Sequence, residues 1–304
     1  YSIQVQNRLK KNNFFAYVQN TTEISGNQTI TGGIRLHYLD MNKQWLLSPR
    51  IQYSLAPRWR KDLMIRAAVG LYQQPPFYRE MRNREGVLNT DLKAQSSFHS
   101  ILSLDHNIFL WRRPFKITTE FYYKYLWNVV PYDIDNVRIR YYGENMAVAY
   151  AAGIDFRISG DFIPGDQSWF SLGLLTTKED IEGDGRDYIP RPSDQLVNFN
   201  IFFQDHLPIN PTYRMNLNLF FATGLPFSPP GNPEYRNAFR GPSYQRIDIG
   251  FSKMISFARM PRNPLKSLMI SAEILNLTAH DNVISYYWVK DVKSNVYAVP
   301  NTLS

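Results

Sequence analysis

Apolar and polar side chains alternate along most of this chain, most clearly in residues 117–129. One face of this segment carries Ile117, Thr119, Phe121, Tyr123, Tyr125, Trp127 and Val129. The other carries Thr118, Glu120, Lys124 and Asn128, together with Tyr122 and Leu126. A strand turns successive side chains to opposite faces, whereas a helix would mix these two sets around its circumference. The segment is therefore predicted to be a β-strand with one apolar face.

The same alternation recurs from end to end and predicts about twelve strands. Clear further examples are 197–204 and 213–222, and the other candidates are 14–24, 29–39, 46–55, 63–72, 97–109, 148–159, 168–177, 244–255 and 267–277. Each is near the roughly 9 to 11 residues that a tilted strand needs to cross a bilayer.

The predicted connections alternate in length. Short connections fall at 56–62, 110–114, 160–166, 207–211 and 257–266, and long ones at 74–95, 131–146, 178–191 and 227–243. Outer-membrane barrels have short periplasmic turns and longer extracellular loops. The predicted fold is therefore an all-β, antiparallel transmembrane β-barrel, and the connection lengths assign its two sides.

A soluble β-sandwich is the alternative fold. Its inner face would also alternate with a polar outer face. Sandwich strands are usually shorter, near 5 to 6 residues, which disfavours this alternative.

Composition agrees with a barrel. Aromatic residues make up 15% of the chain, yet its mean hydropathy is −0.37. No run approaches the roughly 18 to 20 apolar residues of a membrane helix, and the N-terminus lacks the pattern of a signal peptide. The net charge of +8 comes from basic residues scattered singly along the chain, so no nucleic-acid partner is expected.

Several runs resemble the barrel of TonB-dependent outer-membrane receptors, most closely those of Bacteroidetes-type bacteria. They are LSPRIQYSL (47–55), IRAAVGLYQQPPFYREM (65–81), YIPRPSD (188–194), TGLPF (223–227), YQRIDIGF (244–251) and EILNL (273–277). In that family the PPF element begins an extracellular loop. The order of the runs matches the C-terminal half to two thirds of the family.

The resemblance implies a barrel of about 22 strands. It also implies a preceding plug domain, an N-terminal segment that engages the TonB complex, and a last strand ending in an aromatic residue. None of these is in the sequence, so residues 1–304 are interpreted as a single domain, a partial receptor barrel.

The function implied by the resemblance is TonB-driven uptake of a scarce solute: a siderophore, cobalamin, a glycan or a peptide. The expected partners are that solute, the TonB complex and outer-membrane lipid or lipopolysaccharide, and no cofactor is expected. The alternatives are a non-energised porin or structural barrel, and a soluble carbohydrate-binding β-domain. An upstream plug would distinguish a receptor from a porin, and partition into detergent would distinguish a barrel from a soluble domain.

The candidate ligand contacts lie in the first long loop, because binding residues concentrate on loops carried by a rigid scaffold. They are Phe77, Tyr78, Arg79, Arg82 and Arg84. A solvated loop, or one that meets lipopolysaccharide, would have the same composition. The strand alternation predicts a second set that lines the lumen: Arg66, Glu120, Lys124, Arg157, Asn200, Arg214 and Asn216. Aromatic residues on the opposite face are expected to meet lipid: Tyr125, Trp127, Phe199 and Phe221.

Catalytic and metal motifs are weak. Asp180, Glu182 and Asp184 mimic the opening of a calcium loop, but Arg191 stands where the closing Glu would be needed. His99 and His106 are predicted on opposite faces of one strand. There is no cysteine and no nucleophile or phosphate-loop motif, so an enzyme is not expected.

Overall fold

Twelve antiparallel strands follow one another in chain order through one continuous sheet, and the two-residue strand β11 (Ile189–Pro190) pairs with one of them, β10. The computed structural model describes residues 9–135, 137–163, 166–207, 210–229, 232–257 and 265–303. The strands are β1 (Asn13–Ser25), β2 (Gln28–Leu39), β3 (Gln44–Leu55), β4 (Leu63–Gln74), β5 (Gln95–Leu110), β6 (Arg113–Val129), β9 (Ala147–Ile163), β10 (Asp166–Ile181), β12 (Val197–Leu207), β13 (Asn210–Ala222), β16 (Tyr244–Ser256) and β17 (Ser267–Ile274). All twelve predicted strands are confirmed.

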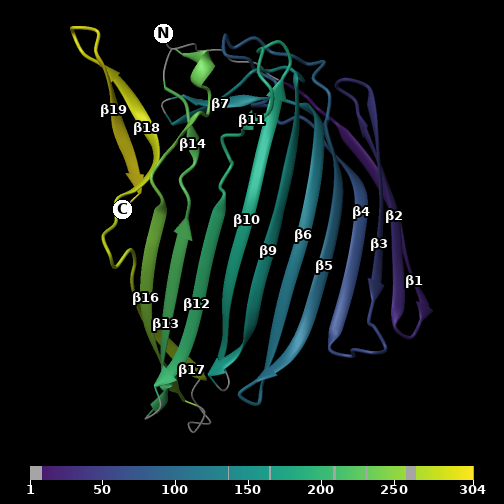
Figure 1. The fold of residues 1–304 in the computed structure, drawn as a ribbon, viewed down its shortest axis with the longest axis vertical. Helices are drawn as coiled ribbons and strands as arrows, with labels where there is room; N and C mark the ends of the chain where they lie inside the picture. The colour runs from purple at the N-terminus through teal and green to yellow at the C-terminus, as the bar shows by residue number, and fades with distance from the viewer. Residues whose placement is uncertain are drawn as a thin grey trace.

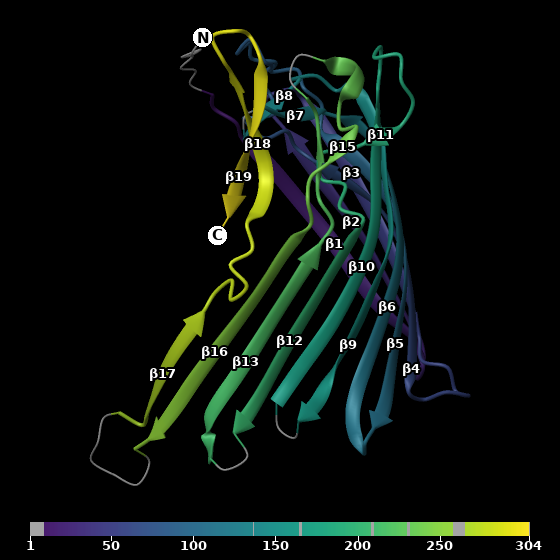
Figure 2. The ribbon, with the colours of Figure 1, turned by 60° about the vertical axis from the view of Figure 1, so that its left-hand side comes forward.

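The sheet curves like part of a barrel wall, with β1 at one edge and β17 at the other (Figures 1 and 2). The described part of the chain contains no helix with the length and hydrophobicity of a membrane span.

The predicted strand lengths were too short. β6 and β9 each have 17 residues, which extends about 56 Å at 3.3 Å per residue. The hydrocarbon core is only about 30 Å thick, so these strands continue beyond it. The last predicted segment was too long, because β17 ends at Ile274. Asn276 has a φ of 49° and its N–H donates to Asp248 at 2.8 Å, so the chain leaves the sheet there.

The predicted short turns gather at one end of the sheet and the predicted long connections at the other, which we call the loop end (Figure 1). The short connection 40–43 between β2 and β3 also lies at the loop end, where Asn42 donates to the Leu92 carbonyl. The turn between β5 and β6 consists of Trp111 and Arg112, whose φ angles are 50° and 63°. Two consecutive positive φ angles are those of a type I′ hairpin turn, which matches the twist of the flanking strands. The predicted short connections at 160–166, 207–211 and 257–266 lie partly outside the described residues.

The loop end carries small elements that the sequence pattern did not predict. They are β7 (Tyr132–Asp135), β8 (Arg138–Tyr141), β11 (Ile189–Pro190), β14 (Pro226–Phe227), a 3-10 turn (Pro233–Tyr235), β15 (Phe239–Arg240), β18 (Asn282–Lys290) and β19 (Val296–Leu303). β18 and β19 pair with each other as a separate hairpin, which stands beside the loop end (Figure 2).

Fully buried apolar side chains gather near the loop end. One cluster joins Met81, Leu92 and Val130, and a second contains Val129, Ala149 and Ile181. Along the wall the sheet is a single layer, so large apolar side chains stay exposed on one face. The strand register aligns four of them, Leu102, Phe121, Ile154 and Leu174, in one row that half-buried Val197 continues on β12. We call this side the apolar face and the opposite side the polar face.

Candidate functional site

The seven side chains predicted to line a lumen all lie on the polar face. Directly paired strand residues share a face, and one such row runs through Arg66, Ser103, Glu120, Asp155 and Gly173 to Asn198. A neighbouring row runs through Arg157 and Ser171 to Asn200. Lys124, Arg214 and Asn216 are an even number of residues from members of these rows or from their partners, which places them on the same face.

Ion pairs and aromatic contacts hold the charged residues of the polar face. Asp105 is almost buried and pairs with Arg66 and, at 3.1 Å, with Lys116. Arg157 lies over the ring of Trp169 at 4.9 Å. The prediction did not include Asp105. It lies an even number of residues from His99 on the same strand, so the alternation of side chains would have placed it on the polar face.

Aromatic residues predicted to meet lipid lie on the apolar face. Phe199 and Phe221 are directly paired, and Tyr125 stacks with Trp127 at 6.2 Å between ring centroids. His99 and His106 lie on opposite faces, because they pair with Lys124 and Ile117 respectively.

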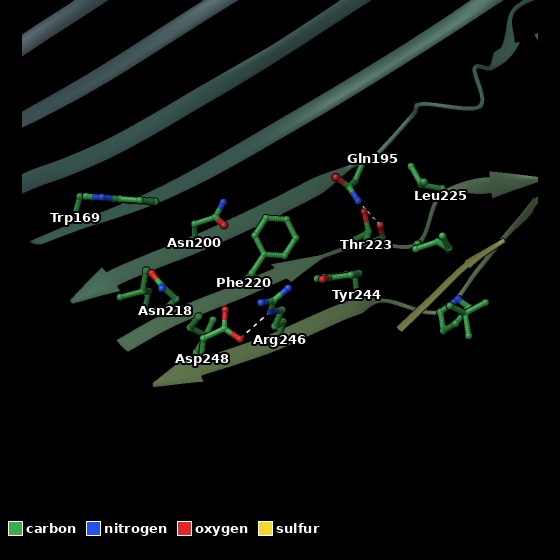
Figure 3. A pocket seen from close by; sticks show the side chains of 16 residues that line it. Trp169, Gln195, Asn200, Asn218, Phe220, Thr223, Leu225, Tyr244, Arg246 and Asp248 are labelled. Carbon is green, nitrogen blue, oxygen red and sulfur yellow. Dashed lines mark hydrogen bonds and ion pairs between the residues drawn. The ribbon is translucent and has the colours of Figure 1, made fainter. Parts of the chain in front are cut away.

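A pocket of about 560 Å³ opens on the polar face, where β10, β12, β13 and β16 meet the loop end (Figure 3). Asn200 is one of the predicted residues and lines it beside Asn218, Phe220 and Tyr244. Phe220 and Tyr244 meet edge to face at 5.2 Å. The Arg246 Nε donates to Asp248 Oδ1 at 2.8 Å. The register of β12, β13 and β16 therefore brings side-chain amides, aromatic rings and one ion pair together in this pocket.

The predicted contact loop between β4 and β5 is anchored by Glu80 and Met81, both buried. Glu80 accepts hydrogen bonds from the Phe77 N–H at 2.8 Å and from the Gln95 amide at 2.9 Å. Burial raises the pKa of Glu80 above its ordinary value, although these hydrogen bonds and nearby Lys11 act in the opposite direction. The anchored loop leaves Phe77 and Tyr78 more than half exposed.

The three predicted arginines of this loop differ. Arg79 is exposed, and Arg82 is half-buried where its backbone bridges to Leu88. Arg84 pairs with Asp133 of β7 and lies 4.4 Å above the ring of Tyr142. Arg84 thus already joins two loops.

A buried ion-pair cluster, which the sequence reasoning missed, joins the loops to the wall. We call Arg236, Glu179, Asp133 and Arg191 the loop clamp. The guanidinium of Arg236 contacts Asp133 and fully buried Glu179, each at 2.6 Å. Arg191 reaches the second oxygen of Glu179 at 3.2 Å. Arg236 is 57 residues from Glu179 and 103 from Asp133, so no local spacing marks them as partners.

The three acidic residues of the calcium-like loop do not form a cage. The Asp184 carboxylate accepts a hydrogen bond from the Arg186 N–H at 2.9 Å and pairs with its guanidinium at 3.1 Å. Within the described ranges, which include Asp180, Glu182 and Asp184, no three carboxylate or imidazole groups converge as metal ligands.

Comparison with known proteins gives a consistent result. A family model described as TonB dependent receptor-like, beta-barrel, matches residues 1–277. No curated protein sequence matches the chain. Among solved structures, the outer membrane transporter YddB of Escherichia coli is 14% identical with a TM-score of 0.67, and the match covers 97% of this chain and 44% of that protein.

Two further structures are similar. The ferric-catecholate import receptor Fiu of Escherichia coli has a TM-score of 0.64 at 14% identity, covering 96% of this chain and 43% of Fiu. The FrpB iron transporter of Neisseria meningitidis has a TM-score of 0.62 at 13% identity, covering 91% of this chain and 42% of FrpB. The chain spans less than half the length of each of these proteins.

Proposed function

Because the chain belongs to the TonB-dependent receptor-like β-barrel family, we propose that it builds the barrel wall of a receptor that takes up a scarce solute. The family places it in the outer membrane of Gram-negative bacteria. The family match over residues 1–277 carries this proposal, and the family and its structural neighbours are transporters and receptors. No catalytic step is assigned to the barrel.

In this proposal the polar face lines the lumen and the apolar face meets lipid. A row that contains Leu102 and Phe121 would be stable against hydrocarbon, whereas the adjacent row with Glu120 and Asp155 would not. The lumen-lining residues are then Arg66, Glu120, Lys124, Arg157, Asn200, Arg214 and Asn216.

The exposed loop residues are the proposed first contacts for the solute. Phe77 and Tyr78 offer rings, and exposed Arg79 offers hydrogen-bond donors beside them, with half-buried Arg82 further along the same loop. Arg84 would hold the neighbouring loop through Asp133. Siderophore, cobalamin, glycan and peptide all remain candidate solutes.

The energy for uptake would come from the TonB complex, acting on a region N-terminal to this wall. Outer-membrane lipid and lipopolysaccharide would contact the aromatic residues of the apolar face and the outer loops.

Uptake with and without TonB tests the proposal. Cells carrying the full-length gene as their only receptor of this type are given a panel of labelled siderophores, cobalamin, oligosaccharides and peptides. At least one solute is expected to accumulate only when TonB is present. Equal accumulation after deletion of TonB would instead support a non-energised porin.

A further inference from the structure

The polar face changes its chemistry from one half of the sheet to the other. Between β4 and β9 it is charged, with Arg66, Asp105, Lys116, Glu120 and Lys124 among its side chains. On β12 and β13 four asparagines take the corresponding positions: Asn198, Asn200, Asn216 and Asn218. We call these four residues the asparagine wall. This half of the polar face therefore adds many uncharged hydrogen-bonding groups to its charged residues, Arg214 and the Arg246–Asp248 pair.

Neighbouring glycines leave room for the asparagine wall. Asn198 pairs with Gly173, and Asn216 pairs with Gly250. A Cβ atom at position 173 would lie 2.7 Å from the Asn198 amide oxygen, and one at position 250 only 2.1 Å from that of Asn216. A larger residue at either position would therefore push an amide aside.

Two members of the wall, Asn200 and Asn218, line the pocket of about 560 Å³ (Figure 3). Neither side-chain amide has a hydrogen-bond partner among the described residues of this chain, whereas the Gln195 amide of the same pocket donates to the Thr223 carbonyl at 3.2 Å. An amide offers two donors and an acceptor with two lone pairs. Asn200 and Asn218 can therefore satisfy a ligand rich in both donors and acceptors.

Aromatic rings border these amides on both sides. Trp169 stacks with Phe202 at 6.1 Å between ring centroids, and Phe202 pairs directly with Asn218. On the other side Phe220 pairs directly with Asn200 and meets Tyr244. The negative face of an aromatic ring attracts the weakly positive C–H groups of a flat ligand.

The pocket has no net formal charge. Among the residues that line it, only Arg246 and Asp248 are charged, and they pair with each other. A charged ligand would lose its hydration here without gaining a free counter-charge. From the unpartnered amides, the bordering rings and this neutrality, we propose that the pocket binds an uncharged, polyhydroxylated solute of the sugar class. This assignment rests on the proposed uptake function and names its substrate class.

Titration calorimetry on the purified full-length protein tests the assignment. The probes are neutral hexasaccharides of glucose, mannose and xylose, with a ferric tris-catecholate as the anionic comparison. At least one neutral hexasaccharide is expected to bind. The double variant Asn200→Ala with Asn218→Ala should weaken that binding about ten-fold or more, because two hydrogen-bonding groups are lost.

Two matched variants separate loss of contact from loss of fold. Phe220→Leu keeps an apolar side chain but removes the ring, and should also weaken binding. Lys61→Ala removes an exposed charge in the short turn between β3 and β4, away from the pocket, and should change affinity by less than about two-fold. Folding of every variant is checked by comparing the mobility of unheated and heated samples in gel electrophoresis, since the folded barrel migrates differently from the unfolded chain.

The outcomes distinguish this assignment from the function itself. Failure of every neutral hexasaccharide to bind, or unchanged affinity in the double variant with normal folding, overturns the sugar assignment. If the protein still takes up a ferric catecholate only with TonB, the uptake function stands without it. Sugar uptake that is independent of TonB would overturn the energised mechanism but retain the pocket.

Discussion

Substitution of Leu217 by Arg should destabilise the barrel, because Leu217 lies on the apolar face near the centre of β13 (Asn210–Ala222). Its direct neighbours are Phe203 on β12 and Ile249 on β16, both apolar. An Arg on the lipid face near the bilayer midplane costs about 2 to 4 kcal/mol. That cost lowers the folding equilibrium constant by about 30-fold to 700-fold.

The control is Asn216→Arg, on the next residue along the same strand and on the opposite face. Asn216 is directly paired with Gln204, so an Arg there would stay on the polar face and avoid hydrocarbon. Its free energy of unfolding should change by less than about 1 kcal/mol.

Urea unfolding of the full-length protein in lipid vesicles, followed by tryptophan fluorescence, measures both variants. A shift of the midpoint at constant slope reports a change in stability. Equal destabilisation by the two substitutions, or a larger effect of Asn216→Arg, would refute the assignment of the faces.

Three further predictions concern the loop end. Arg236→Ala leaves buried Glu179 with only Arg191 as its ion-pair partner, and should destabilise the loops by about 3 kcal/mol in hydrogen exchange. Arg140→Ala, which breaks an exposed pair with Asp135, should cost less than about 1 kcal/mol, and equal costs would contradict a buried clamp. The pKa of Glu80 is raised by burial, so the folded loop favours the protonated acid and this stabilisation is lost as pH rises above about 4. Hydrogen-exchange protection of residues 75–94, corrected for the intrinsic exchange rate, should therefore fall as pH rises above about 4 in the wild type. It should change less in Glu80→Gln. Protection that increases with pH in the wild type would contradict a raised pKa of Glu80. Gly224→Ala places a Cβ atom 1.8 Å from the Gly241 carbonyl oxygen and should lower the free energy of unfolding by about 1 to 3 kcal/mol. The control Gly32→Ala has no atom within 4 Å of the added Cβ and should leave the free energy of unfolding nearly unchanged. Similar unfolding midpoints for the two variants would count against the contact at Gly224.

The sequence predicted the wall well because each strand encodes its own faces. Phe121 and Glu120 differ in polarity at adjacent positions, so the assignment needs no knowledge of neighbouring strands. Strand ends were less certain, since β6 begins at Arg113, four residues before the predicted start. There the strand has left the lipid, and alternation is no longer required.

The loop clamp could not be predicted in this way. Arg236 and Glu179 are 57 residues apart, and their pairing depends on how two long loops fold over the end of the sheet. The hairpin of β18 and β19 was also missed, although Val283 to Val289 is rich in aromatic and β-branched residues, a signal for a strand. The pocket was predicted only in part. Asn200 was predicted to line the lumen, but its grouping with Phe220 and Tyr244 depends on the register between strands.

The concentration of buried apolar side chains near the loop end bears on how this protein can change over evolution. Lipid chains are fluid and adapt to any apolar shape, so a Leu on the apolar face can be exchanged for Phe or Val at little cost. Met81, Leu92 and Val130 instead meet other side chains at the density of a protein interior, where even a single methylene matters. On the apolar face of the strands, residues should therefore change often from one apolar type to another while staying apolar. The base of the loops should keep its side-chain volumes while the exposed tips above it diverge.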